Sequence, residues 1–117
     1  MTKWQSLTPE QQNEFRRRSN GCGAGIFIAP KKGVHFESCV IHDFDYDRGG
    51  DARDRLIADL LFLQDMLQRL ADLNEPIWTT RIAMWQAFLY FLLVRAFGWY
   101  FFNSEPSSRV LDVLQNY

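Results

Sequence analysis

The most informative part of the chain is Ser38-Cys39-Val40-Ile41-His42-Asp43-Phe44-Asp45-Tyr46. It contains one of the two histidines and one of the two cysteines of the protein. On a helix, the adjacent side chains of His42 and Asp43 diverge by about 100°, so they cannot bind one atom side by side. They can instead serve two neighbouring subsites, one for a proton and one for a cation. This stretch is therefore the first candidate for the chemistry of the protein.

Length and composition indicate one domain, residues 1–117, with a single modest core. The formal net charge of −1 gives no sign of nucleic acid as a partner. No apolar run follows Lys3, so the start is not typical of a secretory signal. Two cysteines allow one disulfide at most, and such a bond would suggest a periplasmic, extracellular or virion-associated protein.

The apolar pattern predicts an all-helical chain. Apolar spacing, capping residues and helix breakers predict helices over 9–18, 36–47, 52–73, 80–102 and 108–116. The loop over 20–35 begins with alternating glycines, which let the backbone approach a ligand closely. Only a short break at Gly49-Gly50 separates the helices 36–47 and 52–73, so we expect them to lie antiparallel. Antiparallel packing would bring His42 and Asp59 to similar positions along the axis of the helix pair.

The helix over 80–102 is apolar on nearly every side, with Gln86 and Arg95 as its strongly polar interior residues. A chain this small needs a central element, so we expect a core helix that packs on the helix 52–73. Two alternatives stay open: a face for a protein partner, a second copy or a membrane surface, and a true membrane span, for which the length suffices. We expect Gly98 to allow a close approach by a neighbour.

Three kinds of chemistry are compatible with these residues. Cys22 and Cys39 can form a disulfide, or they can be two small buried thiols. Asp43 with backbone carbonyls of the glycine loop would offer the hard oxygen ligands that calcium prefers, whereas the histidines and cysteines match no zinc spacing.

The third kind is a proton relay. His42 can act as a base near neutral pH, with Asp59 fixing its tautomer. The alternatives are a structural histidine and a buried Asp59 that is bonded to Tyr46 or to an arginine.

Taken together, Cys22-Gly23-Ala24-Gly25, then Cys39-Val40-Ile41-His42-Asp43, then Tyr46, resemble the secreted phospholipase A2 superfamily. The likeness covers residues 20–68 and is strongest for the compact bacterial branch and for small phage-encoded proteins with the same signature. It implies a fold with two antiparallel active-site helices, a calcium loop and, in this chain, a hydrophobic third helix packed on them.

The resemblance also implies a role for each matching residue. His42 would activate water, Asp59 would orient His42, and Tyr46 would bond to Asp59. The carboxylate of Asp43 would bind calcium together with loop carbonyls, and a disulfide would pin the loop. The resemblance implies that calcium is bound by the backbone carbonyls of Gly21, Gly23 and Gly25. It also implies a disulfide between Cys22 and Cys39.

The expected function is calcium-dependent hydrolysis of a phospholipid acyl ester at a membrane surface. One alternative is a non-catalytic lipid- or protein-binding module on the same fold, in a phage virion or an envelope assembly. Another is a small membrane-associated structural protein, with Trp85, Trp99 and Tyr100 as interfacial anchors. A protein partner or a second copy would bind through the helix 80–102.

Overall fold

The computed structural model describes residues 3–19, 35–73 and 76–117, and within these ranges it is helical without strands. This confirms the expected all-helical class. The elements are η1 (Trp4–Ser6), α1 (Pro9–Arg18), α2 (Phe36–Arg48), α3 (Ala52–Asp72), α4 (Ile77–Phe97), η2 (Gly98–Tyr100) and α5 (Ser108–Asn116), where η denotes a 3₁₀ turn.

The bounds of most helices follow from local capping. α1 and α5 coincide with the predicted ranges, and α2 and α3 each differ from theirs by one residue at the C-terminal end. At α1, the side chain of Thr8 accepts from the backbone of Gln11, whose side chain bonds back to Thr8. Asp51 and Asp54 form the same reciprocal box at α3. The loop predicted over 20–35 lies outside the described residues except for His35, which precedes α2.

The predicted range of α4 was wrong at both ends. The helix begins at Ile77, directly after Pro76, and ends at Phe97, where the chain tightens into η2. Gly98, the first residue after α4, makes a close contact. A Cβ atom on Gly98 would collide with the hydroxyl of Tyr46 from α2, so the expected close approach at this glycine is present.

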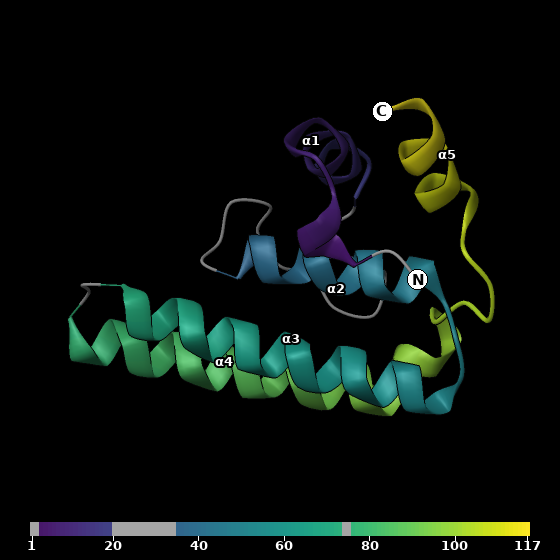
Figure 1. Cartoon of the computed structure of the whole chain (residues 1–117). Helices are drawn as coiled ribbons and strands as arrows, with labels where there is room; N and C mark the ends of the chain where they lie inside the picture. Colours follow the sequence, from purple (N-terminus) through teal and green to yellow (C-terminus); the bar gives the residue numbers. More distant parts are fainter. Residues whose placement is uncertain (1–2, 20–34, 74–75) are drawn as a thin grey trace.

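The helices stack in layers (Figure 1). α3 and α4 run side by side and antiparallel, α2 lies on them, and α1 and α5 lie on the other side of α2. α2 and α3 are antiparallel, as expected, and the turn between them uses Gly49 with φ of 84°. A Cβ at Gly49 would come within 2.8 Å of the backbone of Glu105, so this turn needs glycine on two counts.

Two hydrophobic clusters flank α2. The cluster toward α1 and α5 is built on Trp4, Phe15 and Phe44, whose rings meet edge to face at 5.2–6.1 Å between centroids. The cluster toward α3 and α4 contains Cys39, Phe62, Met66, Ala87, Tyr90 and Val94. α2 is therefore fixed from both sides, which holds its polar residues in place between the clusters.

α4 packs on α3 as expected, but it is not a buried core helix. Its buried residues form one narrow seam: Ala83, Ala87, Tyr90 and Val94. The opposite side is open, and Trp85 is 75% exposed. α3 is the helix that packs along α4, and it covers this one stripe. By length and composition alone, the segment Ile77–Tyr100 could cross a membrane.

Candidate functional site

The centre of the candidate site is a contact between α2 and α3. Nε2 of His42 lies 2.7 Å from Oδ1 of Asp59. The Asp59 side chain is fully buried, and the His42 side chain is 10% exposed. The ring of Phe62 stacks on the imidazole at 4.4 Å between centroids. The antiparallel arrangement thus brings His42 and Asp59 together, as the spacing along the two helices predicted.

Tyr46 joins the same carboxylate from one turn further along α2. Its hydroxyl donates to Oδ1 of Asp59 at 2.6 Å. Burial, and then the hydrogen bond to Asp59, raise the pKa of Tyr46, so the phenol stays protonated and remains a donor. The backbone of Gly98 closes the other side of the hydroxyl.

Arg95 is a further member of the site and is the arginine partner that the sequence predicted for Asp59 only as an alternative, without saying which arginine. Its Nη1 donates to Oδ2 of Asp59 at 2.7 Å, so both carboxylate oxygens are bonded. Arg55 of α3 donates in return to the carbonyls of Val94 and Arg95, at 2.9 and 2.8 Å. The hydrogen bonds of the two arginines therefore connect α3 and α4 near Asp59. The available signal was one arginine within an apolar helix and one aspartate within an apolar stretch, each needing a partner.

The charge of Asp59 determines which ring nitrogen of a neutral His42 carries the proton. Burial raises the pKa of Asp59, but the hydrogen bonds from His42, Tyr46 and Arg95 and the charge of His42 outweigh burial, so the pKa is below its ordinary value. An ionised carboxylate can only accept hydrogen bonds. Nε2 of a neutral His42 must therefore carry the proton, which leaves the lone pair on Nδ1. No described residue hydrogen-bonds to Nδ1.

His42 also lines a cavity of about 260 Å³ between η1, α2 and α3. Its apolar wall includes Ile41, Ile57, Leu61 and Phe62. The lining also includes the charged residues Lys3, Asp45, Arg48 and Asp65, so the cavity has both apolar and charged walls next to the imidazole.

The Asp43 side chain contacts residues outside the network of His42 and Asp59. Its Oδ2 accepts from the Ser19 hydroxyl at 2.8 Å, and Nη2 of Arg109 lies 3.2 and 3.3 Å from its two oxygens. Arg109 also pairs with Asp47 and donates to the carbonyl of Arg18. The contacts of Asp43 with Arg109 and Ser19 were not predicted, because both join segments far apart in the chain.

The calcium site stays a prediction. The expected carbonyl ligands Gly21, Gly23 and Gly25 lie outside the described residues, and the part of the chain that is described holds no cluster of three or more His, Cys, Asp or Glu for a metal. Asp43 suits a hard cation chemically. A calcium ion would, however, have to replace Arg109 and Ser19 at the two carboxylate oxygens.

The predicted disulfide is also untested. Cys39 is buried in the cluster between α2, α3 and α4, and it is not a free thiol. Its predicted partner, Cys22, lies outside the described ranges, so the pairing stays a prediction.

Comparisons with protein-family models, curated proteins and solved structures gave no match to this chain. Functional inference therefore depends on the geometry. His42, Asp59 and Tyr46 come together in one buried network, with Arg95 as a further member. Asp43 is adjacent in sequence but belongs to a separate network with Arg109.

Proposed function

We propose that this protein is a phospholipase A2-like enzyme that hydrolyses an acyl ester of a phospholipid in a calcium-dependent reaction. The observation that carries the proposal is the buried bond between Asp59 and His42 beside a cavity of about 260 Å³. An imidazole oriented by an ionised carboxylate can act as a general base for water, and Ile57, Leu61 and Phe62 offer apolar contacts for part of an acyl chain.

The tautomer of His42 determines which ring nitrogen takes up a proton in the reaction. Nδ1 of His42 takes a proton from water while the water oxygen attacks the ester carbonyl carbon. The bond from that carbon to the glycerol oxygen then breaks, and His42 returns the proton to this oxygen. The products are a free fatty acid and a lysophospholipid. Asp59 stays ionised throughout and stabilises the imidazolium, while Tyr46 and Arg95 fix the carboxylate.

Calcium would be held by Asp43 and the carbonyls of Gly21, Gly23 and Gly25, and it would supply positive charge near the carbonyl oxygen. The chemistry of the carboxylate supports this assignment, and its present bonds to Arg109 and Ser19 oppose it.

Release of fatty acid from phosphatidylcholine vesicles, with and without added calcium, tests the proposal. We expect wild type to release fatty acid and His42→Gln to be slower by about 10²–10⁴-fold, which is the usual contribution of a general base. His35→Gln is the matched control, because His35 is the other histidine and is also buried. Release by His42→Gln at the wild-type rate, or none by wild type, contradicts the proposal.

The second candidate is a non-catalytic lipid- or protein-binding module on the same fold. It is favoured by one observation: Arg109 and Ser19 already bond both oxygens of Asp43, as in a structural tie between α2 and α5. Calorimetric titration with calcium separates the candidates. Heat from wild type but not from Asp43→Asn supports the enzyme, whereas none from either supports the module.

A further inference from the structure

The cavity beside His42 has a charged wall to which the proposed reaction gives no role. His42, Asp45 and Arg48 follow one another at intervals of three residues, so their side chains lie along one stripe of α2, which faces the cavity. Lys3, directly before η1, and Asp65 of α3 are the other charged residues of the lining. Two acidic and two basic side chains thus surround the space next to the imidazole.

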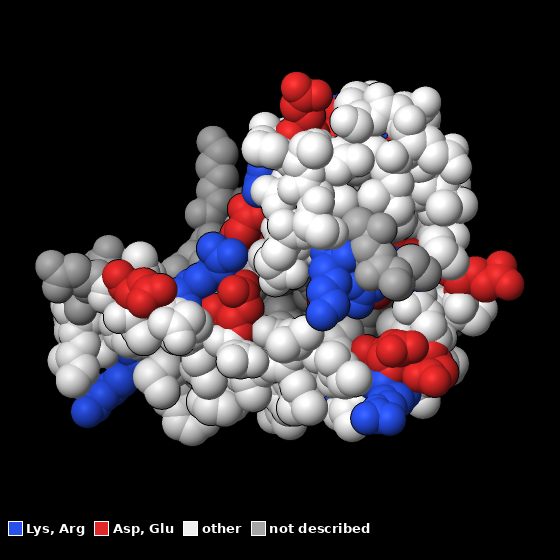
Figure 2. Space-filling view, viewed as in Figure 1, with Lys and Arg blue, Asp and Glu red and all other residues white. Residues whose placement is uncertain are grey.

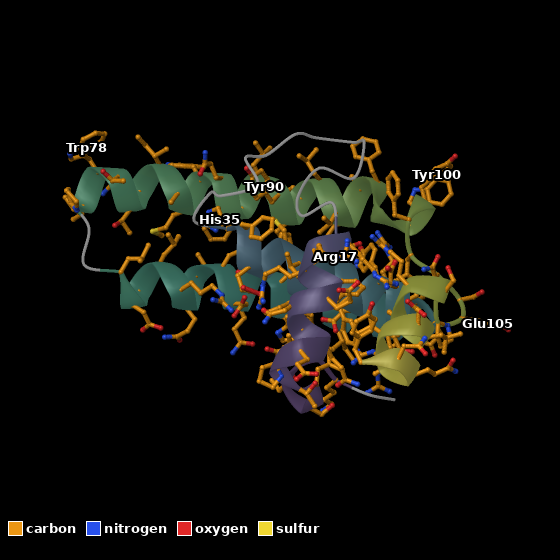
Figure 3. All side chains as sticks on the ribbon, turned by 90° about the horizontal axis from the view of Figure 1, so that it is seen from above. Arg17, His35, Trp78, Tyr90, Tyr100 and Glu105 are labelled. Atoms are coloured by element: carbon orange, nitrogen blue, oxygen red, sulfur yellow. The ribbon has the colours of Figure 1, made fainter. Side chains whose placement is uncertain are left out.

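The cavity lies where η1 meets α3, apart from the apolar helix α4. Its described lining comes from η1 with the preceding residue, from α2 and from α3. Figure 2 shows basic and acidic side chains along the boundary between the upper helices and the α3–α4 layer, where η1 and α3 enclose the cavity. In Figure 3 the α4–η2 segment, marked by Trp78 and Tyr100 at its ends, follows the opposite edge of the molecule. A ligand in this cavity would therefore meet charges of both signs.

Asp45 is a buried carboxylate with few partners. Its side chain is 9% exposed, and its charged partner among the described residues is Arg48, at 3.5 Å. A charge-assisted hydrogen bond of this kind is normally about 2.7–2.9 Å long. No described residue donates a hydrogen bond to the Asp45 carboxylate. Because a buried carboxylate that has lost its water normally gains hydrogen bonds in return, Asp45 has acceptor capacity left for a ligand.

The other acidic residue of the wall has its partners within the protein. Asp65 accepts from the Ser38 hydroxyl at 2.6 Å and from Nε of Arg69 at 2.9 Å. Among the basic residues, Lys3 is exposed, and its ammonium group pairs with no described residue. The wall therefore offers a ligand one acid, Asp45, and one base, Lys3.

A ligand that pairs with both residues must itself carry both charges. The four charged residues of the wall, Lys3, Asp45, Arg48 and Asp65, have no net charge together. An ion of one sign would therefore leave either Lys3 or Asp45 without a partner. A zwitterion with a phosphate and an ammonium group satisfies both at once. This favours a headgroup with no net charge over the anionic glycerol and serine headgroups.

We propose that Asp45 binds the primary ammonium group of an ethanolamine phospholipid, whose phosphate pairs with Lys3. A primary ammonium group has three N–H donors for the carboxylate of Asp45. A quaternary ammonium group has none and binds instead against aromatic faces. Trp4 and Phe62, the aromatic residues of the described lining, already pack against other rings. The wall therefore selects ethanolamine over choline.

This inference rests on the proposed function for the choice of a phospholipid, and it deepens that function by naming the headgroup. Asp45 lies about one turn beyond His42 on α2, so a headgroup bound at Asp45 places the glycerol esters near the imidazole. Ile57 and Leu61 on the apolar wall stay available for the acyl part of the lipid. Asp45 would determine which lipid binds and would take no part in proton transfer.

The first experiment is calorimetric titration of wild type with glycerophosphoethanolamine. This probe has no acyl ester, so the measurement does not depend on hydrolysis. Glycerophosphocholine and glycerophosphoglycerol are the matched probes, because they carry the same phosphate with a quaternary ammonium group or with none. We expect both to bind at least about tenfold more weakly, which is the usual contribution of a hydrogen bond to a charged group.

Three variants assign the contact to its residues. Asp45→Asn keeps the shape of the side chain and removes the charge, and we expect it to weaken binding of glycerophosphoethanolamine about tenfold or more without weakening that of glycerophosphoglycerol. Asp72→Asn is the matched control, since Asp72 is an exposed acid of α3 outside the cavity lining, and it should have no effect. Lys3→Gln should weaken binding of all three probes alike, because they share the phosphate.

The inference is overturned if wild type binds the three probes equally, prefers glycerophosphocholine, or shows no saturable binding of any at millimolar concentration. Unchanged affinity in Asp45→Asn, or an equal loss in Asp72→Asn, overturns it as well. Fatty acid release by a protein that binds no headgroup would refute this inference and leave the proposed enzyme standing. Headgroup binding that depends on Asp45, in a protein that releases no fatty acid, would refute the enzyme and support this inference.

Discussion

Arg95 and Asp59 form the contact that joins the apolar helix α4 to the candidate catalytic network. Nη1 of Arg95 donates to Oδ2 of Asp59 at 2.7 Å, while Oδ1 accepts from His42 and Tyr46. One buried carboxylate thus holds the imidazole, the phenol and the guanidinium together. The placement of α4 and the orientation of His42 consequently depend on each other.

Replacing Arg95 should destabilise the fold. Arg95→Met keeps an apolar stem but leaves the charge of Asp59 with fewer partners. We expect a loss of about 2–3 kcal/mol, less than for a fully buried pair, because the Arg95 side chain is 33% exposed. Urea unfolding measures this loss. Arg81→Met, on the exposed side of the same helix, is the control and should change the free energy of unfolding by less than about 0.5 kcal/mol. Equal effects of the two variants would contradict the assigned role.

A methyl group at Gly98 should disturb Tyr46. In Gly98→Ala the new Cβ would meet the hydroxyl of Tyr46, and overpacking of this kind costs about 1–3 kcal/mol. Removing the hydroxyl should make room. We therefore expect the double variant Gly98→Ala with Tyr46→Phe to be more stable than the sum of the single effects predicts, as a double-mutant cycle measures. Additive losses would show that the two residues do not compete for space.

The stability of the protein should depend on His35 between neutral and acidic pH. Burial lowers the pKa of His35 from 6.5, while its hydrogen bond to the Ala83 carbonyl acts in the opposite direction. A lowered folded-state pKa means that stability is fully present above 6.5 and is lost as pH falls through the folded value. The difference in urea midpoint between wild type and His35→Gln should shrink as pH falls from neutral. A constant difference would contradict this.

Arg109 should compete with calcium for Asp43, if calcium binds there. Arg109→Gln removes a cation that lies 3.2 Å from the carboxylate, so we expect calcium affinity to rise about fivefold, or about 1 kcal/mol, in calorimetry. Ser19→Ala, which removes one hydrogen bond and no charge, should have a smaller effect. Weaker calcium binding by Arg109→Gln would show that Arg109 supports the cation site.

The part of the site that the sequence predicted is the part that follows from helix geometry. His42 and Tyr46 are one turn apart on α2, and the short turn at Gly49-Gly50 brings Asp59 opposite them. Capping residues such as Thr8 and Asp51 likewise specified helix starts. These features depend on residues close in sequence or on a single antiparallel turn.

Other features depend on packing that a sequence pattern does not encode. The bond from Arg95 to Asp59 and the pair of Arg109 with Asp43 join segments distant in the chain. The exposure of α4 was predicted only as an alternative to a core helix, because an apolar helix has the same pattern in a protein core and on a lipid surface. Only the arrangement of α2 and α3 shows that one stripe of α4 is covered.

The most direct test of the account is the position of the proton on the neutral imidazole of His42. Nitrogen NMR of histidine-labelled protein distinguishes Nδ1 from Nε2, and His35→Gln leaves a single histidine to assign. We expect a proton on Nε2, held by Asp59, and a bare Nδ1 that can accept a proton from water. A proton on Nδ1 would contradict the role of His42 as the base.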